Sequence, residues 1–161
     1  MSIVYISIGS NLGNKKSNCL HAIELLEKSG IIVKKRSSIH ETEPWGVKDQ
    51  PPFLNMAIEV ETALKPEELL VLLKNVETEV GREKTYQWGP RIIDLDILLF
   101  NSIILNTDDL TIPHPYMHER DFVLRPLNEI APGVKHPLLK LSVSELLQNF
   151  KCKSSGRHGV S

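Results

Sequence analysis

The chain has 161 residues, 41% of them hydrophobic and 24% charged, which is typical of one soluble globular domain with a substantial core. The formal net charge is −1, which argues against a nucleic-acid-binding protein because such proteins usually carry a basic excess. The two cysteines form neither a disulfide framework nor a zinc motif, and no secretory leader or membrane-length apolar run is visible, so we expect a cytoplasmic protein.

The first quarter of the chain predicts a strand, a helix and a second strand. Residues 3–9 alternate between apolar and other side chains, as a half-buried strand does. Residues 9–14 have turn chemistry, and we expect them to connect elements rather than to bind a ligand. A helical apolar spacing over roughly residues 15–29 includes Cys19, which we expect to be buried. Residues 31–39 predict the second strand.

The middle of the chain predicts two more strands around a second helix. Residues 53–62 alternate clearly, and Pro66 begins a helix that ends at Gly81. Glu77 lies off the apolar stripe of this helix, where charged side chains are usually solvated. Residues 94–100 predict the fourth strand. This order predicts an α+β fold, a ferredoxin-like β-α-β-β-α-β sandwich.

The C-terminal part predicts smaller elements. Residues 103–105 and 110–112 predict a small hairpin, and a capping box at Ser142 and Glu145 predicts a short final helix. We expect residues 1–150 to form a single domain and the polar tail, residues 151–161, to pack little.

The strand alternation predicts two chemically different faces of the sheet. The apolar positions expected beneath the two helices are Val4, Ile6, Ile8, Leu54, Met56, Ile58, Val60, Leu95, Ile97 and Leu99. The opposite face then carries Tyr5, Ser7, Phe53, Asn55, Asp94 and Asp96. An aromatic ring lying against Phe53 and a metal-bound phosphate at the aspartates would suit this face.

Asp94 and Asp96 are the strongest candidate for a metal site. Two adjacent carboxylates in an apolar strand repel each other and lose solvation unless a positive charge joins them. Mg²⁺ typically takes one or two carboxylates together with substrate phosphate oxygens. The alternative, which the pattern leaves open, is a solvated edge strand with two outward acids.

Two long loops and a proline-flanked histidine surround this face. The loop over residues 41–52 carries Trp45, which either lines a binding site or belongs to a simple connection. Residues 82–91 are basic and aromatic, which suits a magnesium polyphosphate; the segment is either a lid or a surface loop. His114, between two prolines and followed by Arg120, is either structural or a phosphate contact.

These motifs together resemble the 6-hydroxymethyl-7,8-dihydropterin pyrophosphokinase family of folate biosynthesis. The resemblance extends to about Phe150. It rests on Gly9-Ser10-Asn11-Leu12-Gly13, Asp49-Gln50-Pro51, Phe53-Leu54-Asn55, Trp88-Gly89-Pro90-Arg91, Asp94-Leu95-Asp96, and Pro113-His114-Pro115 with Arg120 and Phe122.

The resemblance implies a Mg²⁺-dependent transfer of pyrophosphate from ATP to the pterin hydroxymethyl group, with release of AMP. Asp94 and Asp96 would hold two Mg²⁺ ions, and Asp94 would also assist deprotonation of the substrate hydroxyl. No covalent enzyme intermediate is implied, so catalysis would consist of positioning and charge neutralisation.

The resemblance also implies the substrate contacts. The pterin would be bound by Thr42, Pro44, Trp45, Phe53, Asn55 and Phe122. The nucleotide would be bound by Glu77, Trp88, His114, Tyr116 and Arg120. Arg82 and Arg91 would support catalysis as loop arginines. The chain departs from common family choices at Trp45, Lys84, Gln87 and Asp109.

Two other functional classes remain as alternatives. A nucleotide- or metal-sensing domain on the same fold would bind ATP without turnover, but it would not need to keep the aspartate pair. An RNA-binding module of this fold would need a basic excess and paired sheet aromatics, which the sequence lacks. We expect ATP and the dihydropterin as partners, no nucleic acid or membrane, and a monomer or a dimer.

Overall fold

The computed structural model describes residues 1–11, 13–42, 53–81 and 92–160, with the backbone alone for Thr42 and residues 153–160. The elements in chain order are β1 Ser2–Ser10, α1 Lys15–Lys28, β2 Ile32–Arg36, β3 His40–Thr42, β4 Phe53–Thr62, α2 Pro66–Gly81, β5 Asp94–Phe100, β6 Leu105–Asn106, β7 Thr111–Ile112, the 3₁₀ helix η1 Met117–Glu119, α3 Asp121–Ile130 and α4 Val143–Val160.

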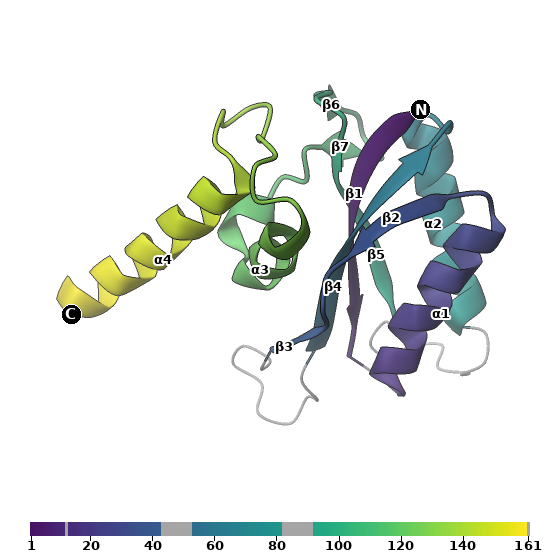
Figure 1. The fold of residues 1–161 in the computed structure, drawn as a ribbon, viewed down its shortest axis with the longest axis horizontal. Helices are drawn as coiled ribbons and strands as arrows, with labels where there is room; N and C mark the ends of the chain where they lie inside the picture. The colour runs from purple at the N-terminus through teal and green to yellow at the C-terminus, as the bar shows by residue number, and fades with distance from the viewer. Residues whose placement is uncertain (12, 43–52, 82–91, 161) are drawn as a thin grey trace.

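An antiparallel sheet in the order β2-β4-β1-β5 forms the centre of the molecule. The short strand β3 also pairs with β4, and β6 pairs with β7 as the predicted hairpin. Helices α1 and α2 cover one face of the sheet, and α3 and α4 lie on the other side (Figure 1). The predicted mixed α and β architecture is therefore confirmed.

Local sequence signals explain the ends of the first two helices. The side chain of Asn14 caps α1 by accepting a hydrogen bond from the backbone N–H of Ser17 at 3.2 Å. Gly30 follows α1 with a φ of +92°, a conformation that favours glycine. Pro66 occupies the first position of α2, where its missing N–H removes no helical hydrogen bond.

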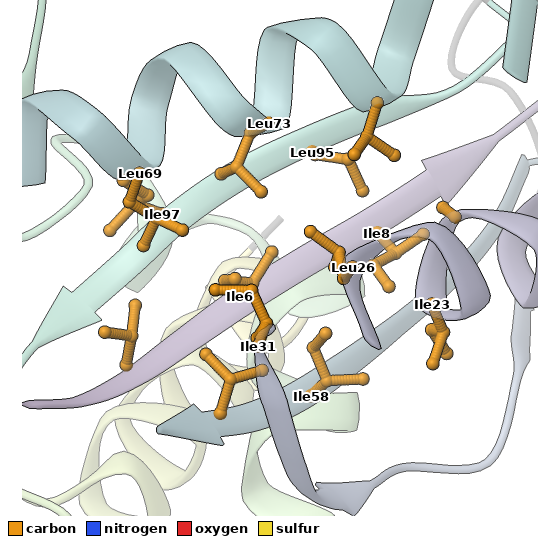
Figure 2. Close-up of a cluster of buried hydrophobic side chains, with 14 of the residues drawn as sticks. Ile6, Ile8, Ile23, Leu26, Ile31, Ile58, Leu69, Leu73, Leu95 and Ile97 are labelled. Atoms are coloured by element: carbon orange, nitrogen blue, oxygen red, sulfur yellow. The ribbon is translucent and has the colours of Figure 1, made fainter. Parts of the chain in front are cut away.

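The main hydrophobic core lies between the sheet and these two helices (Figure 2). Ile6 and Ile8 of β1 face Ile23 and Leu26 of α1, and Leu95 of β5 faces α2. Each of these side chains is almost completely buried. Burial of a single isoleucine or leucine contributes about 1.5–3 kcal/mol to folding, so this core is the main source of stability for the strand bearing the aspartates.

One prediction about β5 is wrong, because the strand contains a β-bulge. Tyr5 pairs with Leu99 and Ile6 pairs with Ile97, which leaves Leu98 as an extra residue in β5. The extra residue shifts the alternation, and Leu99 joins a second cluster on the face opposite α1 and α2. Leu95 and Ile97 precede the bulge and remain beneath the helices as predicted.

Helix α3, which the sequence analysis did not predict, covers part of this opposite face. Its residues Val123, Leu127 and Ile130 pack with Tyr5 and Ala57 in the second cluster. Leu124 on α3 forms a third cluster with residues of α4. The face that carries the predicted site is therefore partly covered by protein.

The capping box before α4 is confirmed. The backbone N–H of Ser142 donates to Glu145 Oε1 at 3.0 Å, and the backbone N–H of Glu145 donates to Ser142 Oγ at 3.1 Å. The helix itself is longer than predicted, since it continues to Val160 and projects away from the sheet (Figure 1). Within the described ranges, no helix combines the length and the apolar character that crossing a membrane requires.

Candidate functional site

The candidate site begins with a row of residues across three strands. Gly9 of β1 pairs with Asn55 of β4 on one side and with Asp94 of β5 on the other. In the next row, Ser7 lies between Ala57 and Asp96. Residues paired in this way project to the same face, and strands lie about 4.8 Å apart. Asn55 and Asp94 therefore lie about 10 Å apart, with only small residues between them.

The close approach of Asn55 favours glycine at position 9, in the centre of this row. A Cβ atom at Gly9 would lie 3.0 Å from Asn55 Oδ1, closer than ordinary van der Waals contact. Asn55 is itself 5% exposed. The absence of a side chain at Gly9 thus gives the Asn55 amide its position over β1.

Asp94 and Asp96 lie on the predicted face. Asp94 is half-buried and Asp96 is exposed, whereas Leu95 between them is buried in the main core. Within the described ranges, no cluster of three or more histidine, cysteine, aspartate or glutamate side chains is arranged for a metal. Two carboxylates whose remaining ligands come from substrate oxygens fit Mg²⁺, which rarely uses an all-protein cage.

Glu77 holds the backbone between the two aspartates. Its Oε2 accepts a hydrogen bond from the backbone N–H of Leu95 at 2.8 Å, and Lys74 Nζ lies 3.4 Å from Oε1. The Glu77 side chain is only 14% exposed, so the expectation of a solvated position is wrong. The reason is that β5 is an edge strand, and α2 passes beside its outward-facing amide.

The electrostatics of Glu77 follow from this position. Burial raises the pKa of Glu77, and the nearby charge of Asp94 raises it further. The hydrogen bond from Leu95 and the Lys74 ammonium lower the same pKa, but burial dominates. Glu77 is consequently placed beside the aspartate pair as a polar support.

The turn after β1 supports the same strand. Ser10 Oγ donates a hydrogen bond to the carbonyl of Ile92 at 2.5 Å, and Asn18 Nδ2 donates to Ser10 Oγ at 3.4 Å. Ile92 lies two residues before Asp94, so Ser10 fixes the start of β5. These contacts give part of the Gly9–Asn14 motif a structural role, as the sequence analysis favoured.

His114, on the segment that follows, lies close enough to Asp96 to interact with its charge. Its backbone N–H donates to the carbonyl of Leu98 at 2.9 Å, and its Nδ1 accepts from the backbone N–H of Tyr116 at 3.2 Å. Burial lowers the pKa of His114, the Asp96 carboxylate raises it, and the Arg120 guanidinium lowers it. With Nδ1 used as an acceptor, the neutral imidazole carries its proton on Nε2.

Arg120 joins residues expected at the two substrates. Its Cζ lies 5.4 Å from the ring centre of Tyr116 and 5.8 Å from that of Phe122, both within cation–π range. Tyr116 is an expected nucleotide contact and Phe122 an expected pterin contact. The structure therefore brings His114, Tyr116, Arg120 and Phe122 together on one side of the sheet.

The remaining predicted residues are placed only in part. Phe53 is half-buried at the start of β4, and the backbone of Thr42 pairs with it. Asp109 lies on an exposed turn between β6 and β7. Other predicted or noted positions lie outside the described residues: Pro44, Trp45, Arg82, Lys84, Gln87, Trp88 and Arg91.

Three contributions to the site were not predicted from the sequence. A glycine within a strand often marks the close approach of another group, so a signal for Gly9 was available. The bond from Ser10 to Ile92 joins residues 82 positions apart, and no local pattern predicts it. The same holds for the contact of Glu77 with the amide of Leu95.

The sequence matches the family of 7,8-dihydro-6-hydroxymethylpterin-pyrophosphokinase over residues 5–132. A Bacillus subtilis protein named 2-amino-4-hydroxy-6-hydroxymethyldihydropteridine pyrophosphokinase is 49% identical over 135 residues, which are 83% of this chain and 81% of that protein. The folic acid synthesis protein of Dictyostelium discoideum is 45% identical over 149 residues, 92% of this chain but only 22% of the length of that protein.

Solved structures show the same fold. The crystal structure of Plasmodium falciparum HPPK-DHPS with pteroate aligns with a TM-score of 0.78 and 18% sequence identity, over 98% of this chain and 44% of that one. At this identity the likeness establishes only the fold. With the match over residues 5–132 and the 49% identical relative, the comparisons show that the chain belongs to the 7,8-dihydro-6-hydroxymethylpterin-pyrophosphokinase family.

Proposed function

We propose that this chain transfers pyrophosphate from ATP to the hydroxymethyl group of 6-hydroxymethyl-7,8-dihydropterin and releases AMP, as a step of folate biosynthesis. The observation that carries the proposal is the row Asn55–Gly9–Asp94, which puts an amide and a carboxylate on one face with no side chain between them. The family and the relative's name support this assignment.

The two substrates would occupy the two ends of this row. The pterin ring would lie between Phe53 and Phe122 and hydrogen-bond to Asn55, whose side chain is already held over Gly9. The ATP phosphates would lie towards Asp94 and Asp96. Thr42, Pro44 and Trp45 remain proposed pterin contacts, by resemblance to the family.

We assign Asp94 and Asp96 as the ligands of two Mg²⁺ ions. Bound Mg²⁺ would supply neutralisation of phosphate charge. Glu77, through the amide of Leu95, would hold the backbone between the two ligands in place. By analogy with metal ligands whose orientation is set by outer hydrogen bonds, this support should affect metal affinity.

The reaction forms one P–O bond, and it breaks another P–O bond and the O–H bond of the substrate hydroxyl. The hydroxymethyl oxygen attacks the β-phosphorus, the bond from that phosphorus to the oxygen bridging the α-phosphate breaks, and AMP leaves with that oxygen. The hydroxyl proton is released, and Asp94 would assist its departure. The chain contributes by positioning both substrates, since no covalent intermediate is needed.

Other residues would bind the nucleotide. Arg120 supplies positive charge beside Tyr116, and His114 presents an N–H at Nε2. Glu77 and Trp88 are also proposed nucleotide contacts, and Arg82 and Arg91 are proposed to support phosphate chemistry. These roles rest on resemblance to the family.

We further infer the topology of the sheet, the bounds of the domain, the cellular location and the oligomeric state. The strand order β2-β4-β1-β5 with α1 and α2 on one face supports a ferredoxin-like sandwich. We propose that residues 1–150 form one domain with a C-terminal tail over 151–161, and that the protein acts in the cytoplasm as a monomer or a dimer.

The test is product analysis by mass spectrometry after incubation with ATP, Mg²⁺ and the dihydropterin. We expect AMP and the pyrophosphorylated pterin together, and neither product without Mg²⁺ or without the pterin. Formation of ADP would contradict attack at the β-phosphorus. Binding of ATP without any product would favour the sensor function instead.

A further inference from the structure

We propose that Glu129 is a positioning residue for pterin binding, which sets the spacing between Phe53 and Phe122 by tying α3 to the connection between β2 and β3. The inference rests on the proposed function, because it assigns the two aromatic rings to the pterin. It concerns a cluster of Ser38, His40 and Glu129 that the proposed mechanism does not use.

The cluster is a dense set of polar contacts around one carboxylate. Glu129 Oε2 accepts a hydrogen bond from the backbone N–H of Ser38 at 2.5 Å, and Oε1 accepts one from Ser38 Oγ at 2.6 Å. His40 Nε2 lies 3.0 Å from the same Oε1. The two hydrogen bonds from Ser38 lower the pKa of Glu129, and His40 lowers it further, so the group is a carboxylate at neutral pH.

The cluster does not have the geometry of a nucleophilic triad. His40 uses one nitrogen, Nε2, for its contact with Glu129 and for its 3.4 Å contact with Ser38 Oγ. A serine–histidine–carboxylate triad needs the carboxylate on one ring nitrogen and the serine on the other. A structural tie between two elements is therefore the better interpretation.

On α3, Glu129 is connected to Phe122 through the helix backbone. Phe122 and Glu129 lie seven positions apart on α3, which is two helical turns, or about 10.5 Å. The spacing places both side chains on the same face of the helix. A shift of α3 at Glu129 would therefore move Phe122 as well.

On the sheet, the residues that contact Glu129 are connected to Asn55 and Phe53 through the pairing of β3 with β4. His40 pairs with Asn55 and Thr42 pairs with Phe53 in the ladder between β3 and β4. Ser37 joins the connection to β4 a second time, because its N–H donates to the carbonyl of Ala57 and its Oγ accepts from the N–H of Ala57, both at 2.9 Å.

Glu129 therefore links the helix that carries Phe122 to the strands that carry Phe53. Phe53 comes from a strand and Phe122 from a helix 69 positions later in the chain, so no local geometry sets the distance between them. Helix α3 packs on β4 through apolar side chains, which are not directional. The hydrogen bonds of Glu129 are directional, and they select one placement of the helix.

The experiment compares Glu129→Ala and Glu129→Gln with the wild-type protein. Glu129→Ala removes all three contacts, whereas Glu129→Gln keeps one acceptor oxygen. The matched control is Glu24→Gln on α1, because Glu24 is also exposed and its carboxylate also contacts one basic side chain, Lys28, at 3.2 Å. We measure kcat, the KM for each substrate, and amide hydrogen exchange over residues 38–42.

We expect Glu129→Ala to raise the pterin KM about tenfold, equivalent to about 1.4 kcal/mol, with the ATP KM unchanged. Glu129→Gln should have a smaller effect, and Glu24→Gln none. Exchange at residues 38–42 should be faster in Glu129→Ala. Equal changes in both KM values, or a lower melting temperature with no change in the pterin KM, would overturn the proposal.

Failure of the proposed function can be distinguished from failure of the role proposed for Glu129. Absence of product from the wild-type protein would refute the function, and calorimetric titration with the dihydropterin would then replace the KM. Unchanged exchange at residues 38–42 in Glu129→Ala would refute the tie even in an active enzyme. As a second test, the double variant Ser38→Ala/Glu129→Ala should lose less pterin-binding free energy than the sum of the losses in the two single variants.

Discussion

Gly9 and Asn55 are cross-strand partners in close contact: a Cβ at Gly9 would lie 3.0 Å from Asn55 Oδ1, so the amide would have to shift to accommodate it. The neighbour of Gly9 on its other side is Asp94. Gly9 thus separates the amide proposed to bind the pterin from the carboxylate proposed to bind Mg²⁺, and it does so without presenting a side chain to either substrate.

We predict that Gly9→Ala weakens pterin binding because the new methyl group displaces the Asn55 amide. The pterin KM should rise about tenfold, which corresponds to about 1.4 kcal/mol, with little change in ATP binding. Gly133→Ala is the control, since a Cβ there would meet nothing within 4 Å. Equal pterin KM values for the two variants would refute the role assigned to this contact.

Asp96→Ala should abolish turnover and leave the fold intact. Asp96 is exposed, so its removal leaves no cavity, but it deletes a proposed metal ligand. We expect kcat to fall by about a thousandfold or more, equivalent to about 4 kcal/mol. Circular dichroism should be unchanged, and Asp108→Ala, on an exposed turn, should retain activity. Near-normal activity of Asp96→Ala would disprove the metal assignment.

Glu77→Ala should reduce both stability and Mg²⁺ affinity. The change leaves the amide of Leu95 without its acceptor, a loss of about 1–3 kcal/mol in the free energy of unfolding for a buried group. Glu77→Gln keeps an acceptor oxygen and should lose less. Urea denaturation and a Mg²⁺ titration of activity measure the two effects, and identical results for the two variants would contradict the hydrogen-bonding role.

The pH dependence of stability should depend on His136. Its Nδ1 accepts hydrogen bonds from the backbone N–H groups of Leu138 and Leu139 at 3.2 and 3.1 Å. Burial lowers the pKa of His136, and the neighbouring His118 lowers it further. Below the unperturbed histidine pKa of about 6.5, His136 therefore binds a proton more readily in the unfolded chain than in the folded chain.

Stability should consequently fall as pH decreases from about 6.5 towards the lower pKa of the folded state. His136→Asn keeps a side-chain acceptor but removes the titrating group. We expect its melting temperature to change less between pH 7.5 and 5.5, which are about one unit on either side of that value. Parallel melting curves for the two proteins would contradict this prediction.

The two cysteines should differ sharply in reactivity. Cys19 is fully buried, as the sequence predicted, and burial raises its pKa to about 11. Cys152 is exposed. A thiol reagent at pH 8 should therefore modify Cys152 alone in the native protein, and both residues after denaturation. Modification of Cys19 at the same rate as Cys152 would show that the core opens readily.

Short-range patterns in the sequence determined the two faces of the sheet and both helices that cover one of them. An alternation of period two is a property of a few consecutive residues, so it correctly placed Leu95 below Asp94 and Asp96. The capping box at Ser142 and Glu145 was also predicted from the sequence, because its contacts join residues only three positions apart. Family membership likewise followed from motifs that are local in the chain.

Only the tertiary structure decided where those local elements meet. The bulge at Leu98 turned Leu99 to the opposite face, and it arises from pairing with β1, 94 positions away. Glu77 is half-buried and contacts the amide of Leu95 because α2 lies beside the edge of β5, and Glu129 joins α3 to Ser38. These contacts join distant segments, so they depend on how helices and strands pack, which no periodicity within either segment encodes.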